Sequence, residues 1–454
     1  MRAAALPLAA LLVLAAVAGA VPALPDDSGT LVSDDPVVSD TPAVSDARDA
    51  VERAPPMQVS SSNETGAGTT INVLGIPPAT ATRSTLKTEY VELGSGLAFG
   101  TGTADVRLET GAVVERIESA PTSDRRQQYL LQEVSAVEER TITLRTRQQQ
   151  VVEAYGNGEV TPRRLLYELA LIDAEARELQ QRRERLQSLA DSTSGFSISS
   201  SRFGNIELQL NTLTGPVRAH AASVLNGEAE STRFFIQSGP DSVELAVIRD
   251  GTYVRETYRG ALRVGNGGSF SLAEAVNATE RAYPTITELR IRDDIVGNPE
   301  SDSTRVSIEH ERGRLVAFVD SGSERVFKEY QYRPIDQVTT TSTTSAIKDG
   351  LELTAHRTYP GGPVRLQLNS TSSDEPVDAQ LTVGPAGGRS SVVGRTGSDG
   401  SLWTLAPSGT YQVTAIDGSS VVVLSVEPTQ TPFVYGDVDE NGFGNETATM
   451  TPTG

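Results

Sequence analysis

The residue types that most often carry catalysis or bind metals are sparse in this chain. Its 454 residues include no cysteine and only three histidines, His220, His310 and His356, which lie far apart in the sequence. No second histidine follows His310 four residues later, so the zinc-binding helix pattern of metalloproteases is absent. Without thiols, cysteine-ligated zinc and thiol redox chemistry are also excluded. We therefore expect neither a metal centre nor a cofactor.

Two Ser-x-x-Lys patterns, at 84–87 and 345–348, have the spelling found in serine–lysine hydrolases. Neither is accompanied by a Lys-Thr-Gly or Ser-Asp-Asn motif, and the chain contains no nucleophile elbow, phosphate-binding loop or dinucleotide fingerprint. Catalysis by paired carboxylates stays open, because a chain with 59 acidic residues could bring many such pairs together. We predict that the protein is not an enzyme, and we keep an extracellular hydrolase with unrecognised carboxylates as an alternative.

The acidic C-terminal stretch contains one partial cation-binding pattern. Oxygen-bearing side chains at alternating positions before a glycine, as in 437–442, begin the loop that wraps calcium in EF-hand proteins. The twelfth position, which must supply a bidentate carboxylate, is Ala448, so the loop is broken. We interpret this stretch as a disordered acidic tail rather than as a calcium site.

Four Asn-x-Ser/Thr sequons are candidate N-glycosylation sites on an exported chain: Asn63, Asn277, Asn369 and Asn445. Two of them fall in segments predicted to be disordered, where a transferase could reach most easily. Asn277 lies inside a predicted helix, which makes it a poorer acceptor.

Residues 124–190 carry the strongest structural pattern. Apolar residues recur with alternating spacings of four and three along two segments that are separated by a Gly-Asn-Gly turn. This is typical of an antiparallel helical hairpin with coiled-coil packing, whose seam is interrupted here by Thr141, Gln148 and Arg183. We interpret the hairpin as a rigid spacer, with a partner docking on its polar face as the alternative. The expected seam positions are Leu130, Val134, Val137, Thr141, Leu144, Gln148, Val151 and Tyr155, then Leu165, Leu169, Ile172, Ala176, Leu179, Arg183, Leu186 and Ala190.

The first 20 residues have the composition of a secretory signal peptide. Arg2 precedes an unbroken run of small apolar residues, and Ala18-Gly19-Ala20 is a suitable cleavage site. The alternative is an uncleaved anchor that extends to about Pro25. No later segment reaches the ~20 apolar residues that a membrane-spanning helix needs. We predict a secreted or cell-surface protein that contacts a membrane only if this segment stays uncleaved.

The charge composition indicates an unusual ionic environment. The net charge is −20, and only Lys87, Lys328 and Lys348 among the 39 basic residues are lysines. Such acidity with almost no lysine is typical of exported proteins of halophilic archaea, because high salt screens the self-repulsion. The alternative is an ordinary acidic extracellular protein from a GC-rich organism. No basic stripe is present, which disfavours nucleic acid, and we predict no nucleic-acid partner.

Composition shifts divide the chain into the segments of a multidomain α+β protein. Val-Ser-Asp repeats with prolines favour disorder in the first part, and alternating apolar residues with Gly-Pro and Asp-Gly turns favour strands after the hairpin. A Ser/Thr run is typical of a solvated linker, and the seven apolar runs after it suit an Ig-like β-sandwich. The predicted segments are a signal peptide (1–20), a disordered acidic tether (21–68), a short strand and helix region (69–120), the helical hairpin (121–191), an α+β domain (192–337), a Ser/Thr linker (338–350), the β-sandwich (351–428) and an acidic disordered tail (429–454).

Local patterns predict individual elements within these segments. We expect a strand at 71–78, a helix at 103–119, a strand at 262–264 and a helix that opens with the capping box 271–274. Along the hairpin, Asp124 with Gln127 is expected to cap the first helix, and Thr161 with Pro162 to start the second.

Two pairings at single residues are also expected. Glu178 and Arg182 have the i,i+4 spacing of a helical ion pair, as do Asp173 and Arg177. Trp403, the one tryptophan, is expected to pack in the sandwich core on the strand face that it shares with Leu405, with a sugar-stacking platform as the alternative.

Two stretches resemble known families. Ile76-Pro77-Pro78, Tyr90-Val91, the run 113–120 and Glu-Ala-Arg-Glu-Leu at 175–179 resemble an uncharacterised secreted-protein family of halophilic archaea, over roughly the N-terminal half. That resemblance implies a compartment and a source, and it says nothing about catalysis. The run 394–415, with its Asp-Gly turn and Pro-Ser-Gly-Thr-Tyr-Gln-Val, resembles the carboxypeptidase-regulatory or transthyretin-like sandwich, which implies an accessory domain used for adhesion or spacing.

Together these patterns predict an exported cell-surface or envelope-associated structural or interaction protein. Its expected partner is a cell-surface protein or a glycan. The alternative is a membrane-tethered accessory or sensor subunit that keeps its N-terminal anchor.

Overall fold

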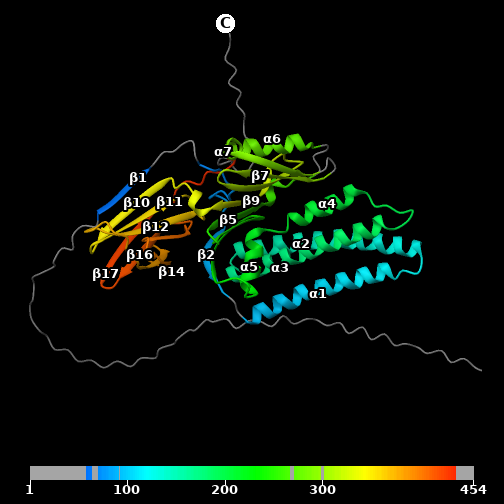
Figure 1. Cartoon of the computed structure of the whole chain (residues 1–454), viewed down its shortest axis with the longest axis horizontal. Coiled ribbons are helices and arrows are strands. Elements are labelled where there is room, and N and C mark those ends of the chain that lie inside the picture. Colours follow the sequence, from blue (N-terminus) through cyan, green and yellow to red (C-terminus); the bar gives the residue numbers. More distant parts are fainter. Residues whose placement is uncertain (1–57, 64–69, 91–92, 266–269, 298–300, 436–454) are drawn as a thin grey trace, which may run out of the picture. The chain divides into compact units, whose positions relative to one another are not determined.

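A computed structural model describes residues 58–63, 70–90, 93–265, 270–297 and 301–435 (Figure 1). Helices and three antiparallel sheets make up this part of the chain, so the predicted α+β class is confirmed. The predicted signal peptide, most of the acidic tether and the partial calcium loop at 437–442 lie outside the described residues.

The largest sheet has eight strands, and every neighbouring pair in it is antiparallel. The strands are β2 Arg83–Glu89, β3 Thr232–Gly239, β4 Ser242–Arg249, β5 Thr252–Arg259, β6 Arg290–Val296, β7 Ser303–His310, β8 Gly313–Asp320 and β9 Val326–Pro334. Their order is β2-β3-β4-β5-β9-β8-β7-β6. The predicted Asp-Gly turn joins β4 to β5, with positive φ at Asp250 (48°) and Gly251 (68°), as a two-residue hairpin turn requires.

Five helices form a layer on one face of this sheet (Figure 1). They are α1 Leu93–Glu118, α2 Ser123–Gly156, α3 Pro162–Asp191, α4 Ser200–Asn211 and α5 Pro216–Leu225. Near the sheet, apolar side chains of α2, α3 and α5 share one core with residues such as Phe234, Leu245 and Phe318. Farther from it, α1 to α4 pack on one another in a second core that contains Leu144, Leu179 and Phe203.

The residues expected in the helical seam are all buried in α2 and α3. Two ion pairs, Arg140–Glu175 and Arg147–Glu168, join the two helices. The residue numbers of both pairs add to 315, as antiparallel neighbours require. The helix ends agree with sequence expectation in part: Thr161 caps α3 with Pro162 in its first turn, whereas α2 is capped by Thr122 and not by Asp124.

Several predictions for the helical layer are wrong. The helix expected at 103–119 begins earlier, at Leu93, because glycines at its start weaken the apolar pattern without breaking the helix. Residues 200–225, expected in a strand-rich region, form α4 and α5. The pair Glu178–Arg182 does not form, because α1 packs on α3: Arg107 pairs with Glu178 (2.7 Å) and Arg182 with Glu109 (3.1 Å). The pair Asp173–Arg177 is confirmed (2.8 Å).

The opposite face of the sheet is covered by an extended segment, 70–78, and by two helices, α6 Leu272–Ala282 and α7 Pro284–Glu288. Side chains such as Ile71, Leu74 and Tyr283 pack there on β7, β8 and β9. The capping box that opens α6 is confirmed. The strand predicted at 71–78 is wrong, since only Val73 forms an isolated bridge. The strand predicted at 262–264 is also wrong, because Leu262 ends a 3-10 turn that began at Gly260.

The C-terminal module is a sandwich of two antiparallel sheets around one apolar core. Its strands are β10 Ser342–Lys348, β11 Leu351–Arg357, β12 Pro363–Ser370, β13 Gln380–Pro385, β14 Ser391–Arg395, β15 Ser401–Leu405, β16 Tyr411–Asp417 and β17 Ser420–Val426. A strand from far upstream, β1 Gln58–Asn63, extends the first sheet to the order β1-β10-β11-β12-β15, and the second is β14-β13-β16-β17.

Two predictions for this module are wrong. The Ser/Thr run is not a linker, because it forms β10, whose alternate residues Ser342, Thr344 and Ala346 are buried. Threonine is β-branched and suits a half-buried strand. Trp403 is half-buried and lies outside the sandwich core. Its neighbour Leu402 packs on that core, so strand alternation turns Trp403 to the outer face.

The chain returns to the eight-stranded sheet after the sandwich. The Val434 N–H donates to the Val73 carbonyl (3.0 Å), and the Tyr435 hydroxyl accepts from the Val326 N–H (2.7 Å). Residues 429–435, expected in a disordered tail, therefore pack beside the segment 70–78. We call residues 427–435 the return segment.

Candidate binding site

Arg255 of β5 is fully buried on the sheet face that is opposite to the helical layer. Its guanidinium pairs with Glu244 of β4 (2.9 Å) and with Glu329 of β9. Burial lowers the pKa of Arg255, but the two carboxylates outweigh this effect and its pKa is raised. Burial also raises the pKa of Glu244, and Arg255 opposes that rise.

This charged cluster fixes the segment 70–78 on the sheet. The Leu74 N–H donates to Glu329 Oε2 (2.9 Å), and Arg255 Nη2 donates to the Leu74 carbonyl (2.9 Å). The Tyr283 hydroxyl of α6–α7 donates to the same Glu329 oxygen (2.6 Å). Each of these hydrogen bonds has one charged partner, the Glu329 carboxylate or the Arg255 guanidinium, which strengthens it, so the buried cluster holds one wall of the site in place.

A second buried cluster, on the other face of the sheet, anchors the helices. Glu256 of β5 accepts from the Val217 N–H at the start of α5 (3.0 Å) and from Arg218 Nε (2.7 Å). Arg218 also donates to Gln148, which explains the polar residue in the α2 seam (2.5 Å). Lys328 donates to the Thr214 carbonyl after α4 (2.6 Å), where a compact ammonium can reach backbone oxygens.

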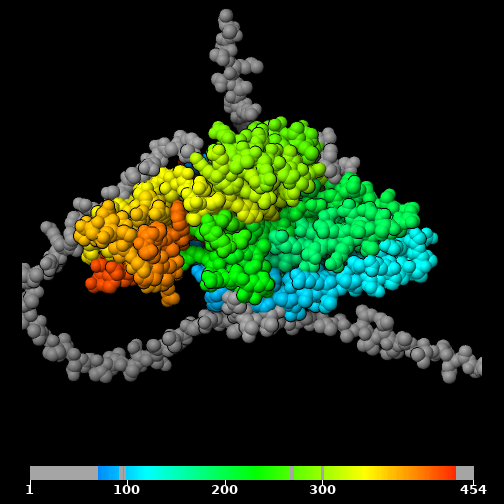
Figure 2. All heavy atoms as spheres, viewed as in Figure 1, coloured from blue at the N-terminus to red at the C-terminus, as the bar shows by residue number. Residues whose placement is uncertain are grey.

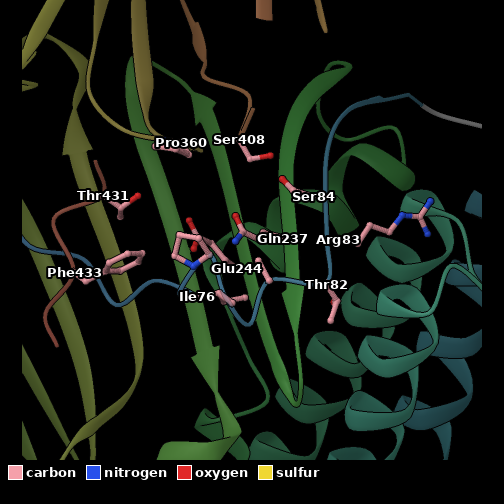
Figure 3. Close-up of a pocket in the computed structure, with 12 residues that line it drawn as sticks. Ile76, Thr82, Arg83, Ser84, Gln237, Glu244, Pro360, Ser408, Thr431 and Phe433 are labelled. Atoms are coloured by element: carbon pink, nitrogen blue, oxygen red, sulfur yellow. The ribbon is translucent and has the colours of Figure 1, made fainter. Parts of the chain in front are cut away.

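Beside the Arg255 cluster, between the sheet and the sandwich, lies a cavity of about 280 Å³ (Figure 3). Figure 3 shows Ser84 and Ser408 at one end of it and Phe433 on another side, whereas Arg83 points away toward the helices. There the Arg83 guanidinium donates to the Tyr155 and Val160 carbonyls. The lining comprises Ile76, Pro78, Ala81, Thr82, Arg83, Ser84, Gln237, Glu244, Pro360, Ser408, Thr431 and Phe433.

A second cavity, of about 300 Å³, lies on the other side of Ser84 and Ser408, which line both. Its walls are β2 and β3 on one side and the β13–β14 hairpin with the turn after β15 on the other. We call the two cavities together the interface groove. The second lining comprises Ser84, Thr85, Leu86, Arg233, Phe235, Val383, Gly384, Pro385, Arg389, Ser391, Pro407, Ser408, Gly409 and Thr410.

A small apolar contact joins the sandwich to the sheet beside the groove. Leu405 of β15 packs with Phe235 and Tyr253 of the sheet, and the Tyr253 hydroxyl donates to the Gly361 carbonyl (3.1 Å). Gly361 has φ 75°, and a Cβ there would lie 2.6 Å from the Phe235 ring, so only glycine fits.

Arg233 brings a positive charge into the second cavity without a carboxylate. Its guanidinium donates to Ser391 Oγ (3.2 Å) and to the Val392 carbonyl (3.0 Å), both of which are neutral. Burial lowers the pKa of Arg233, with no carboxylate to oppose the shift.

The groove therefore offers hydroxyl, amide and guanidinium groups, which suit binding, and its one carboxylate among the lining residues, Glu244, is paired with Arg255. The Ser-x-x-Lys residues give no catalytic pair, because positions three apart on β2 or β10 point to opposite faces of a strand. The histidines stay apart from the groove and from one another: His220 lies on α5, His310 ends β7 and His356 lies on β11. In the described ranges, no three His, Asp or Glu side chains are grouped to hold a metal ion.

Of the candidate glycosylation sites, the three that the structure describes do not line the groove. Asn277 is exposed on α6, but the Thr279 of its sequon is buried and bonded to the Ala275 carbonyl. Asn369 is half-buried on β12, Asn63 ends β1, and Asn445 lies outside the described residues. The groove itself could not be found from sequence, since its walls come from distant segments.

No helix within the described ranges is both long and apolar enough to cross a membrane. The fold defines a multidomain α+β protein whose last module is an Ig-like sandwich. Residues 342–424 match an archaeal fibronectin-III type-like domain, and residues 234–339 match a family of unknown function (DUF7094). Residues 1–230, half of the chain, match a domain of unknown function (DUF7096), and the chain belongs to that family. Neither a curated protein nor a solved structure matches the chain.

The expected unknown-function N-terminal family and the Ig-like C-terminal fold are thus confirmed. The sandwich matches the fibronectin-III type and not the carboxypeptidase-regulatory family that the motif at 394–415 resembles.

Proposed function

We propose that the protein is an exported cell-surface or envelope-associated interaction protein of a salt-adapted host. The observation that carries this proposal is the interface groove, a two-part cavity between a rigid sheet and a fibronectin-III-like sandwich. Clefts between modules, with a few polar groups among apolar ones, are typical ligand sites. The signal-peptide composition of 1–20 and the lysine-poor acidic chain support the compartment and the salty milieu.

Within this function, α2 and α3 act as an antiparallel coiled-coil scaffold. The buried seam with its four-three spacing supports that packing, as do the flanking pairs Arg140–Glu175 and Arg147–Glu168. The scaffold stiffens the sheet that forms one groove wall.

Protease treatment of intact host cells tests the proposed location. We expect the full-length chain to be digested while a cytoplasmic marker survives, and a mature N-terminus near Val21. Protection of the chain together with the marker would refute surface exposure. An exposed chain that begins at Met1 in the membrane fraction would instead favour the membrane-tethered accessory subunit.

A further inference from the structure

The second cavity of the interface groove is unusual in its charge. The chain carries 59 acidic residues and a net charge of −20, yet no Asp or Glu lines this cavity. Two arginines do, Arg233 from β3 and Arg389 from the β13–β14 turn. Two other buried arginines are neutralised inside the fold, Arg255 of β5 by Glu244 and Glu329, and Arg218 of α5 by Glu256.

Arg233 is one of the half-buried arginines for which the described residues supply no carboxylate partner. The groups that accept its hydrogen bonds, Ser391 Oγ and the Val392 carbonyl, carry no charge. A half-buried cation without a counter-charge costs free energy, and a bound anion removes that cost. Arginine holds a carboxylate through two parallel hydrogen bonds, which add geometric specificity to the charge attraction.

The rest of the lining sets the kind of molecule that brings the anion. Hydroxyl groups alternate with apolar surfaces around the cavity, as the hydroxyls and C–H faces of a sugar ring require. A volume of about 300 Å³ is at the small end for ligand pockets, which suits one or two sugar rings better than a folded partner. The hydroxyl groups belong to Ser84, Ser391, Ser408 and Thr410, and the apolar surfaces to Leu86, Phe235, Pro385 and Pro407.

We propose that the interface groove binds an acidic oligosaccharide, whose carboxylates pair with Arg233 and Arg389. This inference rests on the proposed interaction function and names its ligand class. The shared residues Ser84 and Ser408 let the chain of sugars continue into the first cavity, where Gln237 and Thr82 offer further polar groups.

Calorimetric titration of the full-length protein with a galacturonate trisaccharide tests the proposal. We expect saturable binding, no binding of the matching neutral galactose trisaccharide, and at least tenfold weaker binding by Arg233→Gln and by Arg389→Gln. Arg389 is exposed on a turn, so its variant keeps the fold even if Arg233→Gln does not. Arg395→Gln is the matched control, because Arg395 lies on the same hairpin but pairs with Asp378 outside the cavity, and its affinity should not change.

Each other outcome overturns the proposal. Absence of galacturonate binding, equal binding of the neutral sugar, or unchanged affinity of Arg389→Gln would refute an acidic-sugar site in this groove. Tighter binding of oligoglutamate would assign the groove to acidic peptides, and binding of inorganic sulfate alone would indicate an adventitious anion. None of these results bears on protease accessibility at the cell surface, so the two proposals fail separately.

Discussion

At the scale of single residues, the chemistry of this protein is concentrated in arginines. Of the 39 basic residues all but three are arginine, and Arg255 is the most deeply buried example. Its planar fork can reach Glu244, Glu329 and the Leu74 carbonyl at once, which an ammonium on a single stem could not do with the same geometry. Breaking such a buried cluster is costly, because the remaining charges lose their partner.

We predict that Arg255→Leu lowers the free energy of unfolding by about 3–5 kcal/mol, the usual cost of removing one member of a buried ion pair. Urea denaturation at constant salt measures it. The control is Arg292→Ala, which removes the exposed pair with Glu309 and should leave the unfolding midpoint unchanged. Equal shifts of the midpoint in the two variants would show that the Arg255 cluster does not hold the core.

His310 gives the stability a defined pH dependence. Burial, helped by the nearby Arg333 and Arg312, lowers its pKa from 6.5 to about 4. Between pH 6.5 and 4, His310 is therefore protonated in the unfolded chain but stays neutral in the folded chain. Because the unfolded state binds the extra proton, the free energy of unfolding falls as the pH falls through this window.

We predict that His310→Gln reduces the loss of stability between pH 7 and pH 4.5, compared with the unchanged chain. Urea midpoints at the two pH values provide the comparison, and groups that titrate in both proteins cancel. Identical losses in the two proteins would mean that His310 takes up its proton equally well in the folded state.

At the scale of elements, the half of the helical layer that is distant from the sheet depends on helix packing alone. Leu144 of α2 is 1% exposed in a core built from α1 to α4, with no strand residue in it. Ile142, two residues earlier on the same helix, is 59% exposed.

We predict that Leu144→Asp costs more than about 2 kcal/mol, because it places a charge among apolar side chains. Ile142→Asp is the matched control and should change the melting temperature little, since its side chain stays in water. Equal melting temperatures of the Leu144→Asp and Ile142→Asp proteins would refute the seam.

The elements with strong periodicity could be predicted from sequence, and those defined by distant partners could not. The four-three spacing gave α2 and α3, and the Asp-Gly turn gave the β4–β5 hairpin. The strand β10 was missed because a Ser/Thr run looks solvated until its alternate residues meet a core. The segment 70–78 was predicted as a strand because it is rich in apolar residues. Those residues are buried by packing beside α6 and α7 instead, without a ladder of strand pairing.

The candidate site was harder to predict from sequence than the fold was. Ser84, Gln237 and Ser408 meet in the groove although they come from three segments with helices and strands between them. No local spacing links such residues. The sequence shows Arg233 and Arg389 only as two arginines among many. The structure shows that they line the same cavity and that no carboxylate lines it with them.

At the scale of the whole described chain, the regions that match the two families of unknown function do not fold as separate domains. The strand β2, within the first family, pairs with β3 at the start of the second, and helices α2, α3 and α5 complete the core of their shared sheet. In Figure 2 the cyan and green atoms of the helical layer lie directly against the lighter green atoms of the sheet region. Neither region can bury its apolar surface alone. The return segment then ties the sandwich back to the sheet, and this closure forms the first cavity of the groove.

The closure is tested most directly by a disulfide between Val73→Cys and Phe433→Cys. These residues form a parallel bridge, and adjacent strand positions have the Cα separation that a disulfide needs. The chain has no cysteine of its own, so no other disulfide can form within it. The control protein carries Val73→Cys together with Ile416→Cys. Ile416 pairs with Gln380 and Val421 in a sheet of the sandwich and not with the segment 70–78, so no disulfide is expected.

We predict that mild oxidation of the folded Val73→Cys/Phe433→Cys protein yields an intramolecular disulfide in nearly every molecule, seen as faster migration on a non-reducing gel, and none in the control. Free thiols in both proteins would contradict the account, because the return segment would then not lie beside residues 70–78 and the groove would lose a wall.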